Sequence, residues 1–216
     1  SRLVPSIWKF NRWDFDGNSE NDGIGVGLDG QLSVAQANFG INFRSAKNAY
    51  NEKTYDGIRE ISGYFNGLPI PQLALYFQAS RSKDIAYYVE ELGNATNIVV
   101  QSQIKPIDRL IIEPSYQFSR MSDIETDAEF FSGYIARLKF QYQATTAMSI
   151  RLVTQYNDFS QSWDIDPLLT YRLSSFSVFY VGSTYDYMKL SPNTIQPLKW
   201  EMASRQFFMK LQYLFQ

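Results

Sequence analysis

The feature that most constrains this chain is an alternation of apolar and polar residues that recurs along its length. It is clearest in the segment 205–216, RQFFMKLQYLFQ, where one face is wholly apolar and the other mostly polar. The apolar positions there are Phe207, Met209, Leu211, Tyr213 and Phe215. A period of two predicts a β-strand, and a helical period does not fit this segment.

The same alternation predicts about twelve strands over the whole chain. It is strong in the segments 109–119, 132–143 and 163–173. The full set lies near 6–15, 23–33, 37–46, 57–66, 71–82, 94–104, 108–121, 129–143, 147–158, 162–173, 176–187 and 203–216. We therefore expect an all-β protein, and a single domain over residues 1–216, with the C-terminal part of a longer protein as the alternative.

Two classes of all-β protein alternate in this way, and they differ in where the apolar face points. In a soluble barrel or sandwich it points into a core, whereas in a membrane barrel it points to lipid. Strands of about twelve residues exceed the usual soluble length. Aromatic residues make up 16% of the chain at a mean hydropathy of −0.30, and they gather toward strand ends. These features favour an antiparallel up-and-down transmembrane β-barrel of about twelve strands.

The connections between strands indicate an orientation. Short turns are expected near 34–36, 67–70, 105–107, 144–146 and 174–175, and longer polar loops near 16–22, 47–56, 83–93, 122–128, 159–161 and 188–202. Short periplasmic turns and longer extracellular loops are typical of outer-membrane barrels. An even number of strands then places both termini in the periplasm, and we expect a bacterial outer-membrane protein.

Composition excludes most catalytic chemistry. The chain has no His and no Cys, which removes His-based triads, thiolate nucleophiles and His-ligated zinc. A net charge of −2 argues against a nucleic-acid partner. Asp164 and Asp166 share a face with the spacing of a glycosidase pair, but pairing with Arg172 or Arg151 is the stronger interpretation. We expect no enzyme activity, no cofactor and no metal site.

Cations and acids are expected at different heights along the predicted strands. Seven cations are expected to face the lumen in its periplasmic half: Lys105, Arg109, Arg137, Lys139, Arg151, Arg172 and Lys210. The lumen acids on the same wall are Glu113, Asp164 and Asp166. A basic lumen suits either an anion constriction or a filled, hydrogen-bonded interior. Acidic loops such as 122–129 suit cation-bridged contact with lipopolysaccharide.

Two resemblances add to this interpretation. FFMKLQYLFQ resembles the C-terminal insertion signal of bacterial outer-membrane proteins, which implies recognition by the barrel-assembly machinery. SIRLVTQYNDFSQSWDIDPLLTYRL and SRQFFMKLQYLFQ resemble the closing hairpins of a Bacteroidota outer-membrane family of unknown function. In that family a carbohydrate-binding-family-nine-like domain precedes the barrel, and we expect that this sequence lacks it.

The predicted function is an integral outer-membrane barrel, either a passive small-solute pore or the anchor of a larger envelope assembly. Its expected partners are outer-membrane lipid, lipopolysaccharide, the assembly machinery and other envelope proteins. The alternatives are a soluble all-β ligand-binding domain and, third, a carbohydrate-associated outer-membrane protein without its binding domain.

Overall fold

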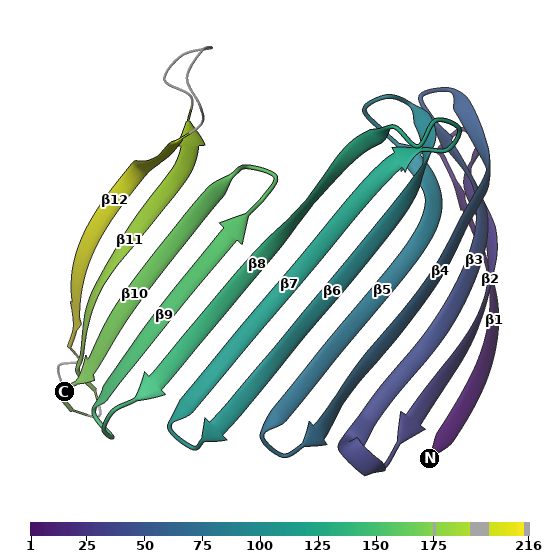
Figure 1. Cartoon of the computed structure of the whole chain (residues 1–216). Coiled ribbons are helices and arrows are strands. Elements are labelled where there is room, and N and C mark those ends of the chain that lie inside the picture. Colours follow the sequence, from purple (N-terminus) through teal and green to yellow (C-terminus); the bar gives the residue numbers. More distant parts are fainter. Residues whose placement is uncertain (175, 191–198, 214–216) are drawn as a thin grey trace. The chain divides into compact units, whose positions relative to one another are not determined.

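The computed structural model describes residues 1–174, 176–190 and 199–213 and consists almost entirely of β-strands (Figure 1). The strands are β1 (Arg2–Trp13), β2 (Ser19–Leu32), β3 (Ala37–Tyr50), β4 (Lys53–Ile70), β5 (Leu73–Ala86), β6 (Glu91–Ile107), β7 (Leu110–Asp123), β8 (Glu129–Gln143), β9 (Met148–Asn157), β10 (Ser162–Arg172), β11 (Val178–Leu190) and β12 (Lys199–Gln212). A short 3-10 turn, Val34–Gln36, connects β2 to β3.

These strands form one twelve-stranded sheet in sequence order, with neighbouring strands hydrogen-bonded. The pairing is antiparallel wherever a register is recorded, from β1 to β5 and from β8 to β12. The predicted all-β, antiparallel, up-and-down fold of about twelve strands is therefore confirmed. No helix in the described part of the chain has the length and apolarity needed to cross a membrane.

The chain divides into two compact units. The first comprises Ser1–Val100 and Gln117–Gly133, and the second comprises Gln101–Tyr116 and Tyr134–Gln216. The boundary crosses β6, β7 and β8, so each of these strands contributes to both units.

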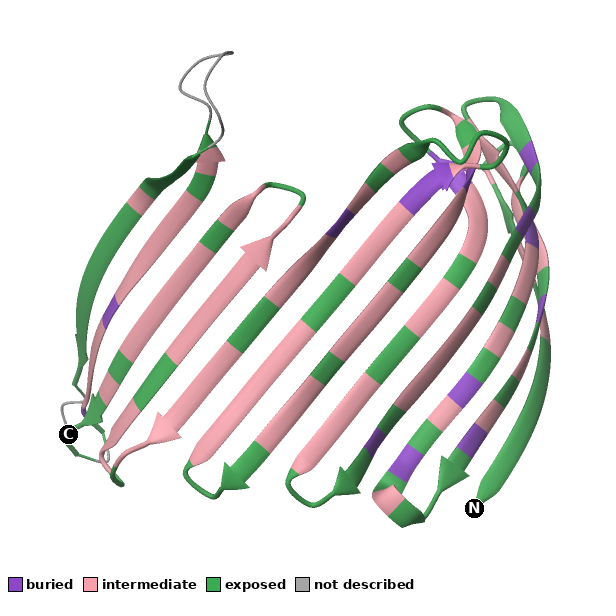
Figure 2. Cartoon of the chain, viewed as in Figure 1, coloured by how far each residue is buried: buried purple, intermediate pink, exposed green. Residues whose placement is uncertain are grey.

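In the first unit, the strand register builds an exposed apolar face. Ile7 lies opposite Val26, Val26 opposite Phe43, and Phe43 opposite Ile61. All four side chains are exposed, from 43% for Phe43 to 72% for Ile7. Because side chains alternate across a strand, the residues between them form a second, polar face. Figure 2 shows that buried positions are few along these strands.

The second unit has the same two faces. Leu138, Ile150 and Leu169 lie on its apolar face, and Phe207, Met209 and Leu211 continue that face on β12. These last three side chains are 60–66% exposed. Gln206, Phe208 and Lys210 take the other face. The alternation predicted for the C-terminal strand is thus confirmed as far as its described residues extend.

Large rings on the polar face of the first unit pack onto glycines of the neighbouring strand. The rings of Trp8 and Phe10 lie over Gly25 and Gly23 of the neighbouring strand, where a β-carbon would overlap them. Near the loops, a small apolar cluster of Ala46, Tyr55, Ile58 and Ile85 is buried. Small glycines opposite large rings let this face pack without a conventional core.

The predicted contrast between long loops and short turns is mostly wrong. Residues 47–56 were expected to form a long loop, but β3 and β4 continue through them and only Asn51 and Glu52 connect these strands, both with positive φ. Similarly, the connection predicted at 83–93 shrinks to residues 87–90. Backbone pairing continues past the point where the apolar alternation ends. The polar ends of these strands were therefore predicted as parts of loops, and the loops are shorter than predicted. The loop expected at 188–202 is partly outside the described residues.

Candidate functional site

The candidate site lies on the polar face of the second unit, where the strand register places charged side chains in rows. Arg137 of β8 lies opposite Gln155 of β9, which lies opposite Asp164 of β10. One row closer to the turns, Lys139 and Asp166 flank Val153. These side chains share a face because residues two apart on a strand point to the same side of the sheet, as do residues directly opposite on neighbouring strands.

A cavity of about 670 Å³ opens on this face within the second unit. Three cations and two carboxylates line it, together with polar and apolar neighbours. The charged lining residues are Glu113, Arg137, Lys139, Arg151 and Asp166. Gln101 and Ser115 add polar groups, and Phe208 adds a ring that lies over Gly182.

Only one of the three cations is neutralised by a direct ion pair. Lys139 Nζ lies 2.6 Å from Glu113 Oε2, and Gln103 Nε2 donates to Glu113 Oε1 at 2.9 Å. Among the described residues, neither Arg137 nor Arg151 makes an ion pair or a side-chain hydrogen bond. The cavity therefore presents two guanidinium groups that are available to an anion.

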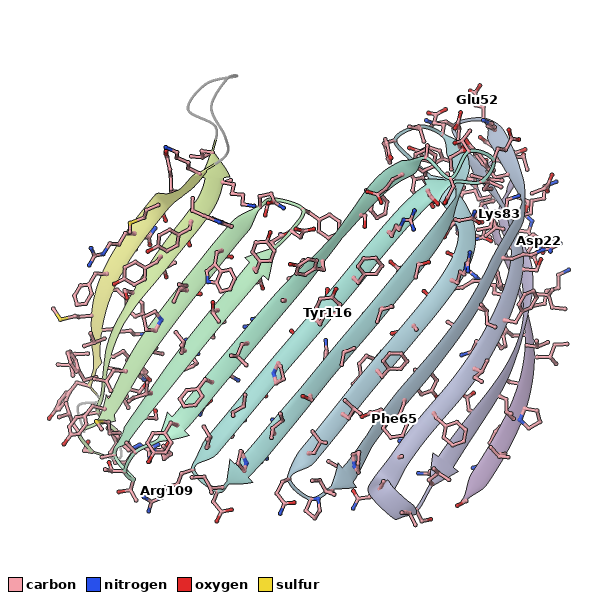
Figure 3. All side chains as sticks on the ribbon, in the orientation of Figure 1. Asp22, Glu52, Phe65, Lys83, Arg109 and Tyr116 are labelled. Atoms are coloured by element: carbon pink, nitrogen blue, oxygen red, sulfur yellow. The ribbon has the colours of Figure 1, made fainter. Side chains whose placement is uncertain are left out.

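The structure brings together some of the predicted lumen residues and not others. Arg137, Lys139, Arg151, Glu113 and Asp166 line the cavity as a group. The other four predicted cations do not line it: Lys105 on β6, Arg109 in the turn before β7, Arg172 at the end of β10, and Lys210 opposite Tyr180 on β12. Figure 3 shows Arg109 at the turn end of the strands.

The expected pairing of the β10 carboxylates with arginine is not present. Neither Asp164 nor Asp166 makes an ion pair with Arg151 or Arg172 in the described part of the chain. Leu168, not a carboxylate, lies opposite Arg151 in the register. The stagger between neighbouring strands thus separates groups that the face assignment alone had placed together.

The sequence interpretation missed a fourth acid on this face. Asp186 of β11 lies directly opposite Asp164 and accepts a hydrogen bond from Ser204 Oγ. The alternation of β11 carries the signal, since Asp186 follows Gly182 and Thr184 at steps of two. The polar face therefore carries two opposed carboxylates, Asp164 and Asp186, on the loop side of the cavity. This face is less basic than the sequence predicted.

The predicted assembly-signal residues lie as expected where the structure describes them. Phe207, Met209 and Leu211 lie in β12 on the apolar face, and Tyr213 directly follows that strand and is 59% exposed. Phe215 lies outside the described residues.

The face offers little for covalent or metal chemistry. No group of three or more metal-ligating side chains occurs among the residues that the structure describes. Asp164 and Asp166 share the face, without a histidine anywhere in the chain to serve as a base near neutral pH. The arrangement is suited to reversible electrostatic binding of small anions.

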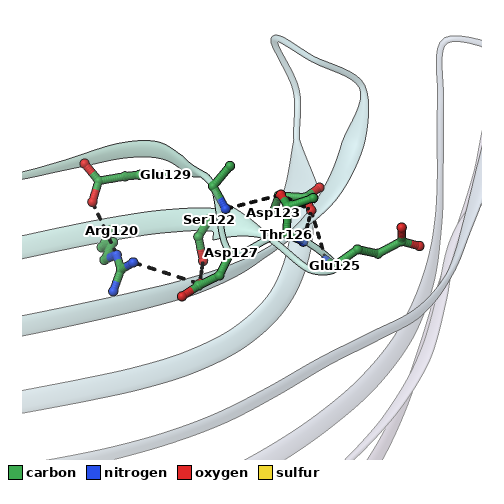
Figure 4. Close-up of polar contacts among 8 residues, drawn as sticks. Arg120, Ser122, Asp123, Glu125, Thr126, Asp127 and Glu129 are labelled. Atoms are coloured by element: carbon green, nitrogen blue, oxygen red, sulfur yellow. Dashed lines mark hydrogen bonds and ion pairs between the residues drawn. The ribbon is translucent and has the colours of Figure 1, made fainter.

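Two loop carboxylates have clear structural roles. Asp14 accepts hydrogen bonds from the Asn18 side chain and backbone and from the Asp16 backbone, which hold its pKa below the usual value. At the end of β7, Asp123 accepts hydrogen bonds from the backbone and hydroxyl of Thr126 and from the Glu125 backbone (Figure 4). Acids of these loops therefore serve to order the connections.

Arg120 pairs with two further acids, Asp127 of this loop and Glu129 at the start of β8. It lies 3.4 Å from Glu129 and 3.9 Å from Asp127 (Figure 4). The acidic character of the segment 122–129 is thus partly neutralised by this neighbouring strand residue.

Comparison with known proteins gives one structural likeness. No family model matches the chain, and no curated protein matches it. A solved structure of the "KdgM porin in complex with disordered oligogalacturonate" aligns over 100% of this chain and 100% of that one. The TM-score is 0.37 and the sequence identity is 9%, values too low to carry function or substrate across.

Proposed function

We propose that this chain forms an integral β-barrel of the bacterial outer membrane and that it passes small anions. Twelve strands place both termini on one side of the membrane, and we assign that side to the periplasm, as in bacterial barrels with an even number of strands. The exposed apolar face supports the membrane part of the proposal. A soluble barrel or sandwich would bury that face, yet Ile41 is 60% exposed and Phe207 is 66% exposed. Lipid is the solvent that such a face requires.

An aromatic row on the apolar face of the second unit supports the same environment. Tyr116, Tyr134, Tyr156 and Trp163 follow one another with ring centroids 5.5, 5.5 and 5.7 Å apart. Figure 3 labels Tyr116 on β7. Girdles of Tyr and Trp at one height are typical of the boundary between lipid and water.

The observation that carries the anion part is the pair of unpaired guanidinium groups in the cavity. Arg137 and Arg151 line it without a carboxylate partner in the described residues, whereas Lys139 is neutralised by Glu113. Rings or clusters of Arg bias a pore toward anions. The nearby Asp164 and Asp186 oppose that field, so we propose a modest preference for anions.

A second candidate is a membrane anchor with a closed interior, which the first unit favours. There, Trp8 and Phe10 lie on glycines and the cluster around Ile58 is buried on the polar face. Arg44 and Glu60 also form an ion pair at 2.9 Å on that face. Such packing can fill a narrow barrel of about twelve strands.

Conductance across a planar bilayer separates the two candidates. In a KCl gradient the reversal potential of the purified protein should be shifted toward the equilibrium potential of chloride. The double variant Arg137→Glu with Arg151→Glu should weaken or invert this shift. The absence of any conductance from correctly inserted protein would support the anchor. Cation selectivity in the unmodified protein would contradict the anion passage.

The membrane assignment has its own test. Folded membrane barrels resist SDS until heated, so heated and unheated samples should migrate differently on a gel. The protein should also require detergent or lipid to stay monomeric. A monomer in plain buffer, with one mobility in both samples, would support a soluble all-β domain instead.

A further inference from the structure

A second cluster of cations lies on the apolar face of the first unit. Arg59 of β4 lies directly opposite Lys83 of β5, and Arg81 precedes Lys83 by two residues on the same face. These three residues line one surface pocket of about 220 Å³ with Ser82, Asn94 and Glu60, whose carboxylate is paired with Arg44. This is the apolar face, because Arg59 precedes the exposed Ile61 by two residues on β4 and Arg81 lies directly opposite Ile61 on β5.

The three cations have no protein partner among the described residues. None of them makes an ion pair or a side-chain hydrogen bond. Several other cations of this unit are compensated, as Lys47 is by Asp56 and Arg44 by Glu60. Like charges directly opposite one another destabilise a sheet, so an anion from outside the chain would stabilise this cluster.

The position of the cluster indicates which anion. On β5 the apolar face carries Leu75, Phe77 and Ala79 before it turns basic at Arg81 and Lys83 toward the loops. Figure 3 shows Lys83 near the loop end of its strand and Phe65 nearer the turns. The cations therefore lie where the apolar band ends, at the height of lipid headgroups.

The pocket itself is amphipathic. Phe43 and Ile61 line it and are 43% and 54% exposed. Arg81 continues their row on β5, and Arg59 and Lys83 form the next row toward the loops. A free phosphate ion would use only the cations. A lipid would use both parts, with its phosphate on the cations and its acyl chain along the apolar side chains.

We infer that Arg59, Arg81 and Lys83 form a binding site for the phosphate group of a lipid in the leaflet on the loop side. With the proposed orientation this leaflet is the outer one, so the ligand is a phosphorylated lipid of the lipid A type. Arginine binds phosphate through paired N–H donors, and lysine adds a point charge. The inference rests on the proposed function in two ways: the apolar face contacts lipid, and the loop side of the barrel faces the outer leaflet.

The test is retention of lipid A by the detergent-solubilised protein, counted by native mass spectrometry with a chelator present. The chelator removes divalent cations, so contacts bridged from acidic loops do not contribute. Bisphosphorylated lipid A should stay bound to the unmodified protein, and dephosphorylated lipid A should not. Arg59→Gln with Arg81→Gln and Lys83→Gln should lower retention by about tenfold or more, since each surface cation adds to anionic lipid affinity.

A matched control changes the same number of cations on the other face. Arg137→Gln with Lys139→Gln and Arg151→Gln should keep lipid retention and alter conductance, and the first triple variant should do the reverse. Arg59→Lys with Arg81→Lys should retain more lipid than the glutamine variant, and heat-dependent mobility in SDS verifies that each variant has folded.

Several results would overturn the site. They are equal retention by the Arg59, Arg81 and Lys83 variant, equal retention of dephosphorylated lipid A, and displacement of the lipid by inorganic phosphate alone. A wrong membrane assignment would give a different result, since the protein would then remain monomeric without detergent or lipid.

Discussion

Lys139 and Glu113 form an ion pair of 2.6 Å between β8 and β7 on the polar face, and this pair removes one predicted cation from the field of the cavity. Arg151 on β9 has no such partner among the described residues. The three predicted cations of this cavity are therefore not equivalent. The pair is neutral as a unit, whereas no ion pair compensates the charge of Arg137 or Arg151.

The first prediction follows from that inequality. Arg151→Gln should lower the chloride-to-potassium permeability ratio, because it removes an uncompensated charge from the cavity. Lys139→Gln combined with Glu113→Gln should leave the ratio close to that of the unmodified protein. Reversal potentials in a salt gradient measure both. Equal effects from the two variants would mean that net charge matters and local pairing does not.

A second prediction tests which face contacts lipid. Leu138 is 39% exposed on the apolar face of β8, and Gln155 lies on the polar face opposite Asp164. Leu138→Arg should destabilise the protein in lipid by roughly 2–4 kcal/mol, since a cation then faces hydrocarbon. Gln155→Arg should be tolerated, because the residue lies on the polar face and Asp164 on β10 offsets the like charge of Arg137 on β8.

Urea unfolding in vesicles of fixed composition measures both changes. If Gln155→Arg proved the more damaging, the polar face and not the apolar face would contact the surrounding lipid.

The fold could be predicted from the sequence because side-chain alternation along a strand depends on sequence alone. Ile24, Val26 and Leu28 lie on one face of β2, and Gly25, Gly27 and Asp29 on the other, as the alternation of the segment 23–33 indicates. Every predicted strand is present, and β8 has the predicted bounds Glu129–Gln143. The lengths of the connections were less predictable, because β3 and β4 pair through residues that no longer alternate.

The site could be predicted only in part. The face of each charged residue follows from alternation, which is why Arg137, Lys139 and Arg151 do share a cavity. Partners across strands depend on the stagger between strands, which no pattern in one sequence specifies. The Lys139–Glu113 pair, the Asp164–Asp186 opposition and the Arg59–Lys83 opposition all required the structure.

A third prediction concerns assembly. Phe207 and Gln206 are neighbours on β12 that point to opposite faces, and Phe207 is 66% exposed on the apolar one. Phe207→Asp should strongly reduce accumulation in the outer membrane, since it places a carboxylate against lipid and interrupts the C-terminal alternation. Gln206→Asp should accumulate normally. Phe215→Asp should behave like Phe207→Asp if the terminal aromatic is also part of the recognition signal.

Fractionated membranes probed with an antibody to an added epitope measure these levels. Normal accumulation of the Phe207→Asp protein would contradict both the lipid-facing assignment of β12 and its role as an assembly signal.

A fourth prediction concerns pH and the connection between β1 and β2. Hydrogen bonds from Asn18 and Asp16 stabilise the Asp14 carboxylate and keep its pKa below the ordinary value of about 3.9. The folded-state pKa is lower than the unfolded one, so this contribution is present above the ordinary pKa and is lost as pH falls through the folded value. Hydrogen exchange at the Asn18 amide should therefore accelerate, relative to the intrinsic rate, only at strongly acidic pH.

Asp14→Ala should give fast exchange at Asn18 across the whole pH range. Protection that declines already near pH 6 in the unmodified protein would show that a different group orders this loop.

The last prediction concerns Trp8 and Gly25, which lie opposite each other in the register of β1 and β2. The indole ring lies over Gly25 so closely that a β-carbon there would overlap it. Gly25→Ala should therefore force the ring aside and cost about 1–3 kcal/mol of unfolding free energy, as overpacking typically does. In a Trp8→Ala background the same glycine substitution should cost little, because the space above it is then empty. The difference between the two costs is a coupling energy that a double-mutant cycle isolates.

Urea unfolding of the four proteins in vesicles provides the values, and an equal cost in both backgrounds would mean that Trp8 does not fill the polar face at this position. Trp8→Ala should also raise single-channel conductance if this ring narrows a passage, which links the packing of the first unit directly to the choice between pore and anchor.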